Sequence, residues 1–217
     1  MAKVDSLCEA GLLAKTALFA EWTPAALKGF QALQQGAFAP GRLSVKEKEL
    51  VAFGCSHVLR CPYCIDYHHG LATKAGATRE ELAEAVWVAI AVAAHGVLAH
   101  ASVTMQCLDG DKPAYYGAAW REELAKFRPL VPGANAGFEA LDGAAFAAGA
   151  LSAELKLLVA VGCAHNEKCP LSIDTYVNAA LAAGIEKAAI AEAAWVAIEM
   201  AAGACLGHSG LAAALME

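Results

Sequence analysis

The sequence predicts an all-helical protein, a helical bundle made of two tandem repeats. Of its 217 residues 58% are hydrophobic, and many of these are alanine, the residue with the highest helix propensity. No segment alternates apolar and polar residues in the way typical of a half-buried strand, so a sheet is not expected. Aligned with itself so that Pro24 falls on Pro132 and His100 on His208, the chain matches without a gap. The fold is therefore expected to contain the same set of helices twice.

Each predicted helix of the first repeat has its own start and stop signals. A helix is expected within residues 1–23, and another over about residues 24–37 begins at a proline. The next helix begins after Ser44, whose spacing to Glu47 matches a capping box, and ends near His57. These signals predict short helices joined by tight connections.

The second part of the repeat predicts one short and one long helix. The short helix runs from Pro62 to Gly76, because proline suits the first helical turn and glycine suits the residue after the last. The long apolar helix starts at the cap signal formed by Thr78 and Glu81 and continues to about Met105. The turn-rich segment Leu108–Pro113 is expected to separate the halves. We therefore divide the chain into an N-terminal helix (1–23), a first repeat (24–107), a linker with a helix (108–131) and a second repeat (132–217).

Charge and composition restrict the class of partner. The net charge is −6 and the pI is about 5.6, which argues against nucleic acid or an anionic membrane surface. The apolar stretch 85–94 ends at His95 and its repeat contains Glu199, so neither is expected to span a membrane. Charged residues interrupt the N-terminal segment, which predicts a helix and not a signal peptide. Eight cysteines without such a signal suggest a reducing compartment, and we expect a cytoplasmic protein.

The first repeat contains a Cys-x-x-Cys motif within the stretch EKELVAFGCSHVLRCPYCIDYHH. If Cys61 starts the third helix, Cys64 and His68 follow at i+3 and i+7 on the same face. The positive end of the helix dipole stabilises a thiolate there. This spacing favours a dithiol that can close and reopen a disulfide without moving the fold.

Glu49 lies on the preceding helix, and a tight turn would bring it to His68. A carboxylate and an imidazole beside a thiol can form a proton relay. The second repeat has Leu157, Ser172 and Tyr176 at the positions of Glu49, Cys64 and His68, and keeps Cys169 as the counterpart of Cys61. Because three of the four positions changed together while the surrounding packing positions were kept, we infer that these residues act together.

Other interpretations of these residues remain open at this point. The cysteines could be buried small residues, or Cys61, Cys64 and His68 could bind zinc with Glu49, although one helix face cannot surround a tetrahedral ion unaided. Glu49 could also be a solvated carboxylate, because neighbouring charges suggest that its turn is partly exposed. Residues kept in both repeats are predicted to be structural, with the two tryptophans in the core: His57, His165, His100, His208, Trp87 and Trp195.

The pattern Glu-x11-Cys-x-Tyr-Cys-x3-His resembles the active site of the alkylhydroperoxidase D-like branch of the carboxymuconolactone decarboxylase superfamily. It is formed by Glu49, Cys61, Tyr63, Cys64 and His68. The resemblance extends over most of residues 24–213. It implies an all-helical fold, homo-oligomers (often trimers or hexamers of single-repeat chains) and thiol peroxidase or disulfide reductase activity. We expect no cofactor and no metal.

The same resemblance implies roles for the site residues. Cys64 would be oxidised to sulfenic acid by a hydroperoxide, Cys61 would supply a proton and then form the Cys61–Cys64 disulfide, and Glu49 and His68 would be the relay. An external dithiol or thiol would restore the pair. With one complete site per chain, the assembly is expected to hold half as many chains as single-repeat forms, with a trimer favoured. A lyase of the carboxymuconolactone decarboxylase type, or a disulfide-relay adaptor without peroxidase turnover, is the alternative.

Overall fold

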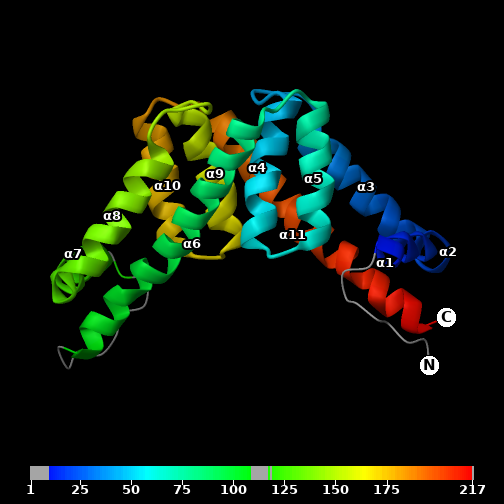
Figure 1. Cartoon of the computed structure of the whole chain (residues 1–217). Helices are drawn as coiled ribbons and strands as arrows, with labels where there is room; N and C mark the ends of the chain where they lie inside the picture. The colour runs from blue at the N-terminus through cyan, green and yellow to red at the C-terminus, as the bar shows by residue number, and fades with distance from the viewer. Residues whose placement is uncertain (1–9, 109–116, 118, 217) are drawn as a thin grey trace.

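The computed structural model describes residues 10–108, 117 and 119–216, and no strand occurs among them. The predicted all-helical class is confirmed (Figure 1). The N-terminal half contains α1 (Ala10–Ala14), the 3-10 helix η1 (Lys15–Leu18), α2 (Phe19–Trp22), α3 (Pro24–Phe38), α4 (Val45–Val58), α5 (Pro62–Lys74) and α6 (Arg79–Leu108). The C-terminal half contains α7 (Trp120–Phe127), the 3-10 helix η2 (Arg128–Leu130), α8 (Pro132–Phe146), α9 (Ala153–Asn166), α10 (Pro170–Ala182) and α11 (Lys187–Met216). Most of the predicted linker and the first nine residues lie outside the described part of the chain.

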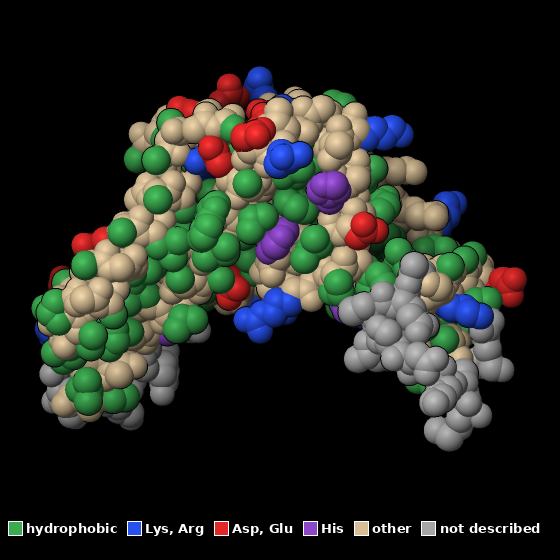
Figure 2. Space-filling model, in the orientation of Figure 1, with side chains coloured by type: hydrophobic (Ala, Val, Ile, Leu, Met, Phe, Trp, Pro, Cys, Tyr) green, Lys and Arg blue, Asp and Glu red, His purple; other side chains and the backbone are tan. Residues whose placement is uncertain are grey.

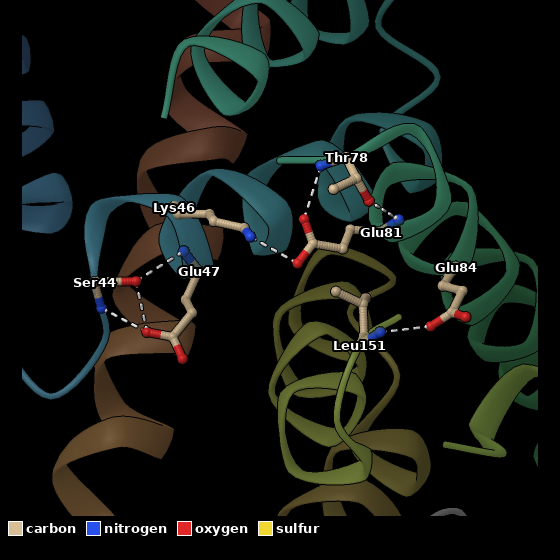
Figure 3. Close-up of polar contacts among 7 residues, drawn as sticks. All are labelled: Ser44, Lys46, Glu47, Thr78, Glu81, Glu84 and Leu151. Atoms are coloured by element: carbon tan, nitrogen blue, oxygen red, sulfur yellow. Dashed lines mark hydrogen bonds and ion pairs between the residues drawn. The ribbon is translucent and has the colours of Figure 1, made fainter. Parts of the chain in front are cut away.

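The predicted cap signals start α4 and α6. At α4 the Ser44 hydroxyl accepts the Glu47 N–H, and the Glu47 carboxylate accepts the Ser44 N–H at 2.7 Å, which confirms the capping box. Thr78 and Glu81 make the same reciprocal pair before α6 (Figure 3). Lys46 then donates to Glu81 at 2.7 Å and ties the two helix starts together. A side chain that caps a helix start in this way stabilises the folded protein by about 1 kcal/mol.

Helices α4 and α9 pack against each other at the centre of the molecule. The approach is close because each carries a glycine at the contact. A Cβ atom on Gly54 would lie 2.8 Å from Val159 Cγ1, and one on Gly162 would lie 2.7 Å from Val51 Cγ1. These distances are too short for a real side chain. The reciprocal contact explains why both repeats keep the glycine, and it joins the two repeats in one core.

The cysteines that follow these glycines are packing residues. Cys55 and Cys163 are both fully buried. A hydrogen bond with Cys55 and burial raise the pKa of the Cys163 thiol well above its usual value. A thiol of this kind is a poor nucleophile at neutral pH.

The long helix of each repeat packs on its own repeat and also extends along the other. Helix α6 packs on α4 and runs along α7, α8, α9 and α10, whereas α11 packs on α9 and runs along α1, α3, α4 and α5 (Figure 1). The molecule therefore spreads into two arms, and each arm contains helices from both halves of the chain. This exchange places residues of α11 beside the helices that carry Cys61 and Cys64.

Two buried ion pairs hold the exchanged helices in place. Glu84 on α6 pairs with Lys156 on α9 at 3.0 Å, and it also accepts the Leu151 N–H at 2.7 Å (Figure 3). Glu192 on α11 pairs with Lys48 on α4 at 3.1 Å. Burial raises the pKa of both glutamates, but hydrogen bonds from backbone N–H groups and the lysines outweigh it and hold each pKa below its usual value. We call these contacts the cross-repeat ion pairs.

Several expectations about exposure are corrected by the packing. The turn around Glu49 is partly exposed at Lys46 and Glu47, as expected, but Glu49 and Lys48 are buried, and Lys48 pairs with Glu192 of α11. Trp87 and Trp195 were expected in the core, but each is 53% exposed. Both lie on helices that are apolar on every side, so the sequence does not show which stripe faces the protein. Figure 2 shows hydrophobic side chains gathered over the centre and along the arm with α7 and α8.

Helices α6 and α11 are long and apolar enough to cross a membrane by length and composition alone. In this structure half of the apolar window of α6, and 44% of that of α11, is buried inside the protein. Both helices contribute buried residues to the core that joins the repeats, and core helices often have this composition.

Candidate active site

A left-handed residue after α4 turns the chain back toward the site. Arg60 has φ of 53°, and its counterpart Lys168 has φ of 54°. The reversal lets α5 begin at Pro62 and run back along α4. Cys61 is the N-cap residue of α5, and its sulfur accepts the Cys64 N–H at 3.2 Å. The first cysteine therefore occupies the positive end of the helix, as its spacing predicted.

Cys61 and Cys64 form a disulfide in this structure. Their Cα atoms are 5.2 Å apart, and both residues are buried. The interpretation of the motif as two unrelated buried thiols is therefore wrong. Within the described part of the chain, no group of three or more His, Cys, Asp and Glu side chains is arranged to hold a metal ion.

Glu49 contacts His68, as the sequence predicted. Glu49 Oε2 lies 2.8 Å from His68 Nδ1, and the two residues are only 4% and 5% exposed. Phe38 stacks on the imidazole at 5.6 Å between ring centroids, and the Tyr67 ring meets it edge-on. Because an ionised carboxylate can only accept, Nδ1 carries a hydrogen and Nε2 is left to exchange protons. The interpretation of Glu49 as a solvated carboxylate is wrong.

A cavity of about 330 Å³ opens beside the disulfide. Cys64 and His68 line it, together with Tyr63 and Tyr67 from the same helix, whereas Cys61 does not. Its other walls come from the N-terminal segment, α3 and α11, and are mostly apolar: Leu13, Thr16, Leu27, Phe30, Gln31, Gln34, Met200 and Leu206. The second cysteine of the pair is thus the one that a substrate in the cavity would meet.

Glu199, on α11 of the second repeat, also lines this cavity, although from the sequence it was noted only as a charge in an apolar stretch and not as a site residue. The residue is 2% exposed, and Oε2 has no hydrogen-bond partner among the described residues. Burial raises its pKa to about 7, with a lowering contribution from the His68 charge. The available signal was a lone acid inside an apolar helix at a position where the first repeat has Ala91.

The second repeat fills the equivalent position with a different set of contacts. Cys169 caps α10 as Cys61 caps α5, but the position of the second cysteine holds Ser172. The Ser172 hydroxyl lies 3.0 Å from His95 Nδ1, and His95 comes from the exchanged helix α6. Tyr176 stacks on Phe146 and lies against the His95 ring. This half therefore has neither a dithiol nor a carboxylate–imidazole pair.

His95 should make the protein sensitive to acid. Burial, together with the charges of Arg128 and Arg121, lowers its pKa from 6.5 to about 4. Neutral, buried His95 therefore contributes about 3 kcal/mol to the free energy of unfolding above pH 6.5. This contribution is lost as the pH falls toward 4. Urea unfolding at pH 7 and pH 4.5 should show a smaller loss for His95→Gln than for the wild type. An equal loss, or the same change in the exposed control His69→Gln, contradicts this prediction.

Comparison with known proteins gives the same two-part organisation. A model of the carboxymuconolactone decarboxylase family matches residues 24–104 and again residues 132–214. The protein called "Uncharacterized protein 4 in cox locus" of Paracoccus denitrificans is 41% identical over 80 residues, which cover 37% of this chain and 72% of that protein. No solved structure matches the chain. Cys61 and Cys64 lie in the first matched region, and the corresponding residues Cys169 and Ser172 lie in the second.

Proposed function

The chain belongs to the carboxymuconolactone decarboxylase family, which includes enzymes, and we propose that it is a thiol-dependent peroxidase. One observation carries this proposal: the Cys61–Cys64 disulfide lies at a helix start, and its second cysteine shares a cavity with the imidazole that Glu49 holds. Peroxide reduction by thiols requires a dithiol and a proton acceptor beside it.

The proposed reaction begins at Cys64, because Cys64 lines the cavity and Cys61 does not. His68 takes the Cys64 proton, and Glu49 stabilises the resulting imidazolium. The thiolate attacks the terminal oxygen of the hydroperoxide, the O–O bond breaks, and Cys64 becomes a sulfenic acid while the alkoxide leaves and is protonated to the alcohol. The Cys61 thiol then attacks that sulfur, water leaves, and the disulfide forms. An external dithiol reduces it by exchange.

The cavity favours an organic hydroperoxide over hydrogen peroxide alone. A volume of about 330 Å³ is within the range of small-molecule sites, and most of the lining is apolar. Hydrogen peroxide would leave this apolar surface uncovered, whereas an alkyl or aryl group would bury it. We therefore propose an alkyl or aryl hydroperoxide as the substrate class.

The assembly and the compartment are also proposals. A homo-oligomer, with a trimer favoured, would cover the exposed Trp87 and Trp195, which occupy equivalent positions in the two repeats. A cytoplasmic location would keep the free cysteines reduced, including Cys55 and Cys163. The acidic net charge supports neither nucleic acid nor an anionic membrane as a partner.

The Cys61→Ser variant tests which sulfur reacts. It lacks the resolving thiol, so one equivalent of cumene hydroperoxide should leave one oxygen atom on Cys64, detected by mass spectrometry and trapped with dimedone. Cys169→Ser in the same background should give the same product, because Cys169 lies in the other repeat. Oxidation at any other cysteine, or none, contradicts the proposal, and lactone decarboxylation that survives loss of both cysteines would point to a lyase. Disulfide exchange with a partner protein, without peroxide consumption, would point to a relay.

A further inference from the structure

We propose that Glu199, supplied by the second repeat, is the acid that protonates the departing oxygen in the site of the first repeat. The inference rests on the proposed peroxidase reaction and adds a catalytic residue to it. Glu199 lines the same cavity as Cys64 and His68, although more than 130 residues separate it from them in the chain. It reaches the site because α11 packs along α4 and α5.

The two exchanged helices differ at the positions that face the two sites. Glu199 corresponds to Ala91 of α6, and Gly203, one turn later, corresponds to His95. A Cβ atom on Gly203 would lie 3.5 Å from Glu199 Oε1, in ordinary van der Waals contact, so position 203 lies directly beside the carboxyl group. The acid therefore occurs only on the helix that faces the complete dithiol site, and not on the helix that faces Ser172. A packing residue of the repeat would be expected on both helices.

The two carboxyl groups near the site have different surroundings. Glu49 Oε2 lies 2.8 Å from His68 Nδ1 and so has a hydrogen-bond partner. Glu199 Oε2 is buried without a hydrogen-bond partner among the described residues, which favours the protonated form. Burial raises the pKa of Glu199 to about 7, so a large fraction carries a proton at neutral pH. The partnered carboxyl group of Glu49 therefore supports the imidazole that acts as the base, and the unpartnered carboxyl group of Glu199 is left to act as the acid.

Few other ionisable groups face Glu199. Those that line the cavity with it all come from α5: Tyr63, Cys64, Tyr67 and His68. Glu49 on α4 acts on it from behind His68. The cavity residues contributed by the N-terminal segment and α3 are uncharged. No lysine or arginine lines the cavity within the described residues, so the groups that can donate to a leaving oxygen are Glu199 and the His68 imidazolium that carries the Cys64 proton.

The proton balance of the step is complete. The Cys64 thiolate forms the S–O bond to the terminal oxygen, the O–O bond breaks, and the alkoxide takes the proton of Glu199 to become an alcohol. The proton that His68 received from Cys64 then restores Glu199. The net change converts one thiol and one hydroperoxide into one sulfenic acid and one alcohol. No oxidant other than the hydroperoxide is needed.

The dependence on the leaving group tests this role. An alkoxide is strongly basic and needs a proton as it leaves, whereas a carboxylate is weakly basic and leaves without one. Glu199→Gln should therefore lower the rate of Cys64 oxidation by tert-butyl hydroperoxide by about 100-fold, within the usual range for a general acid. The same variant should change the rate with 3-chloroperoxybenzoic acid by less than about 3-fold. Both rates are measured by quenching the reduced protein and counting remaining thiols.

The controls separate this role from the proposed function. Glu186→Gln removes an exposed carboxylate in the same repeat and should change neither rate. In the wild type the rate with tert-butyl hydroperoxide should decline above pH 7, and Glu199→Gln should lose that decline. An equal loss with both oxidants, or no loss with either, overturns the role of Glu199 and leaves the peroxidase intact. A wild type that reacts with neither oxidant overturns both.

Discussion

Replacing Cys64 by serine is expected to lower kcat/KM for an organic hydroperoxide by at least about 1,000-fold, or about 4 kcal/mol of transition-state stabilisation. The reason is chemical, because a hydroxyl group in this position neither ionises near neutral pH nor accepts the oxygen reversibly. The side chain keeps nearly the same volume, so the packing around α5 should not change. Hydroperoxide consumption with dithiothreitol as reductant measures the effect.

Cys169→Ser is the matched control for this change. Cys169 caps α10 in the second repeat, as Cys61 caps α5, but it has Ser172 where the first repeat has Cys64. The control should keep the full rate. If Cys64→Ser retains more than about a tenth of the wild-type rate, the thiolate is not the nucleophile and the reaction runs elsewhere.

Replacing Lys156 by methionine is expected to give the largest loss of stability, about 3 kcal/mol in the free energy of unfolding. The Lys156 ammonium is buried, pairs with Glu84 at 3.0 Å and donates to the Ala147 carbonyl. Removing it leaves the Ala147 carbonyl without this donor and Glu84 without its cation. Glu84 keeps its bonds from the Ala150 and Leu151 N–H groups and is a quarter exposed, so the loss stays at the lower end of the range for a broken buried pair. Urea unfolding at a fixed protein concentration measures it.

The surface pair at the start of α4 is the control for this prediction. Lys46 and Glu81 lie 2.7 Å apart, but the lysine side chain is one third exposed. Lys46→Met should therefore cost less than about 1 kcal/mol. Adding Glu84→Gln to Lys156→Met should cost less than the sum of the two single changes, because the pair acts as a unit. Equal losses for Lys46→Met and Lys156→Met would mean that the cross-repeat ion pairs do not hold α6 in place.

The helices and the grouping of Glu49, Cys61, Cys64 and His68 were predictable because they depend on local signals. Caps at Ser44 and Thr78, a proline after Cys61 and the short turn before it fix the starts of α4, α5 and α6. The contact of Glu49 with His68 followed from that turn. The second repeat strengthened the prediction, since it kept the packing residues and lost the reactive ones.

The exchange of the long helices could not be predicted from the repeat. A repeated sequence fixes the helices of each unit but does not say whether the last helix packs on its own unit alone or also on the other, as α6 and α11 do. Glu199 and His95 were therefore visible only as polar interruptions of apolar helices. Lysine is usually exposed, so the burial of Lys48 and Lys156 was not expected. It is explained only by their partners Glu192 and Glu84, which lie far away in the sequence.

The most direct measurement of the proposed activity is the yield of alcohol from the reduced chain without any added reductant. Fully reduced protein, freed of small thiols, is mixed with excess cumene hydroperoxide, and cumyl alcohol and free thiols are counted. The Cys61–Cys64 mechanism predicts one alcohol per chain, the loss of two thiols as one disulfide, and then no further reaction. No alcohol from the wild type, or the same yield from a Cys61→Ser/Cys64→Ser double variant, would contradict it.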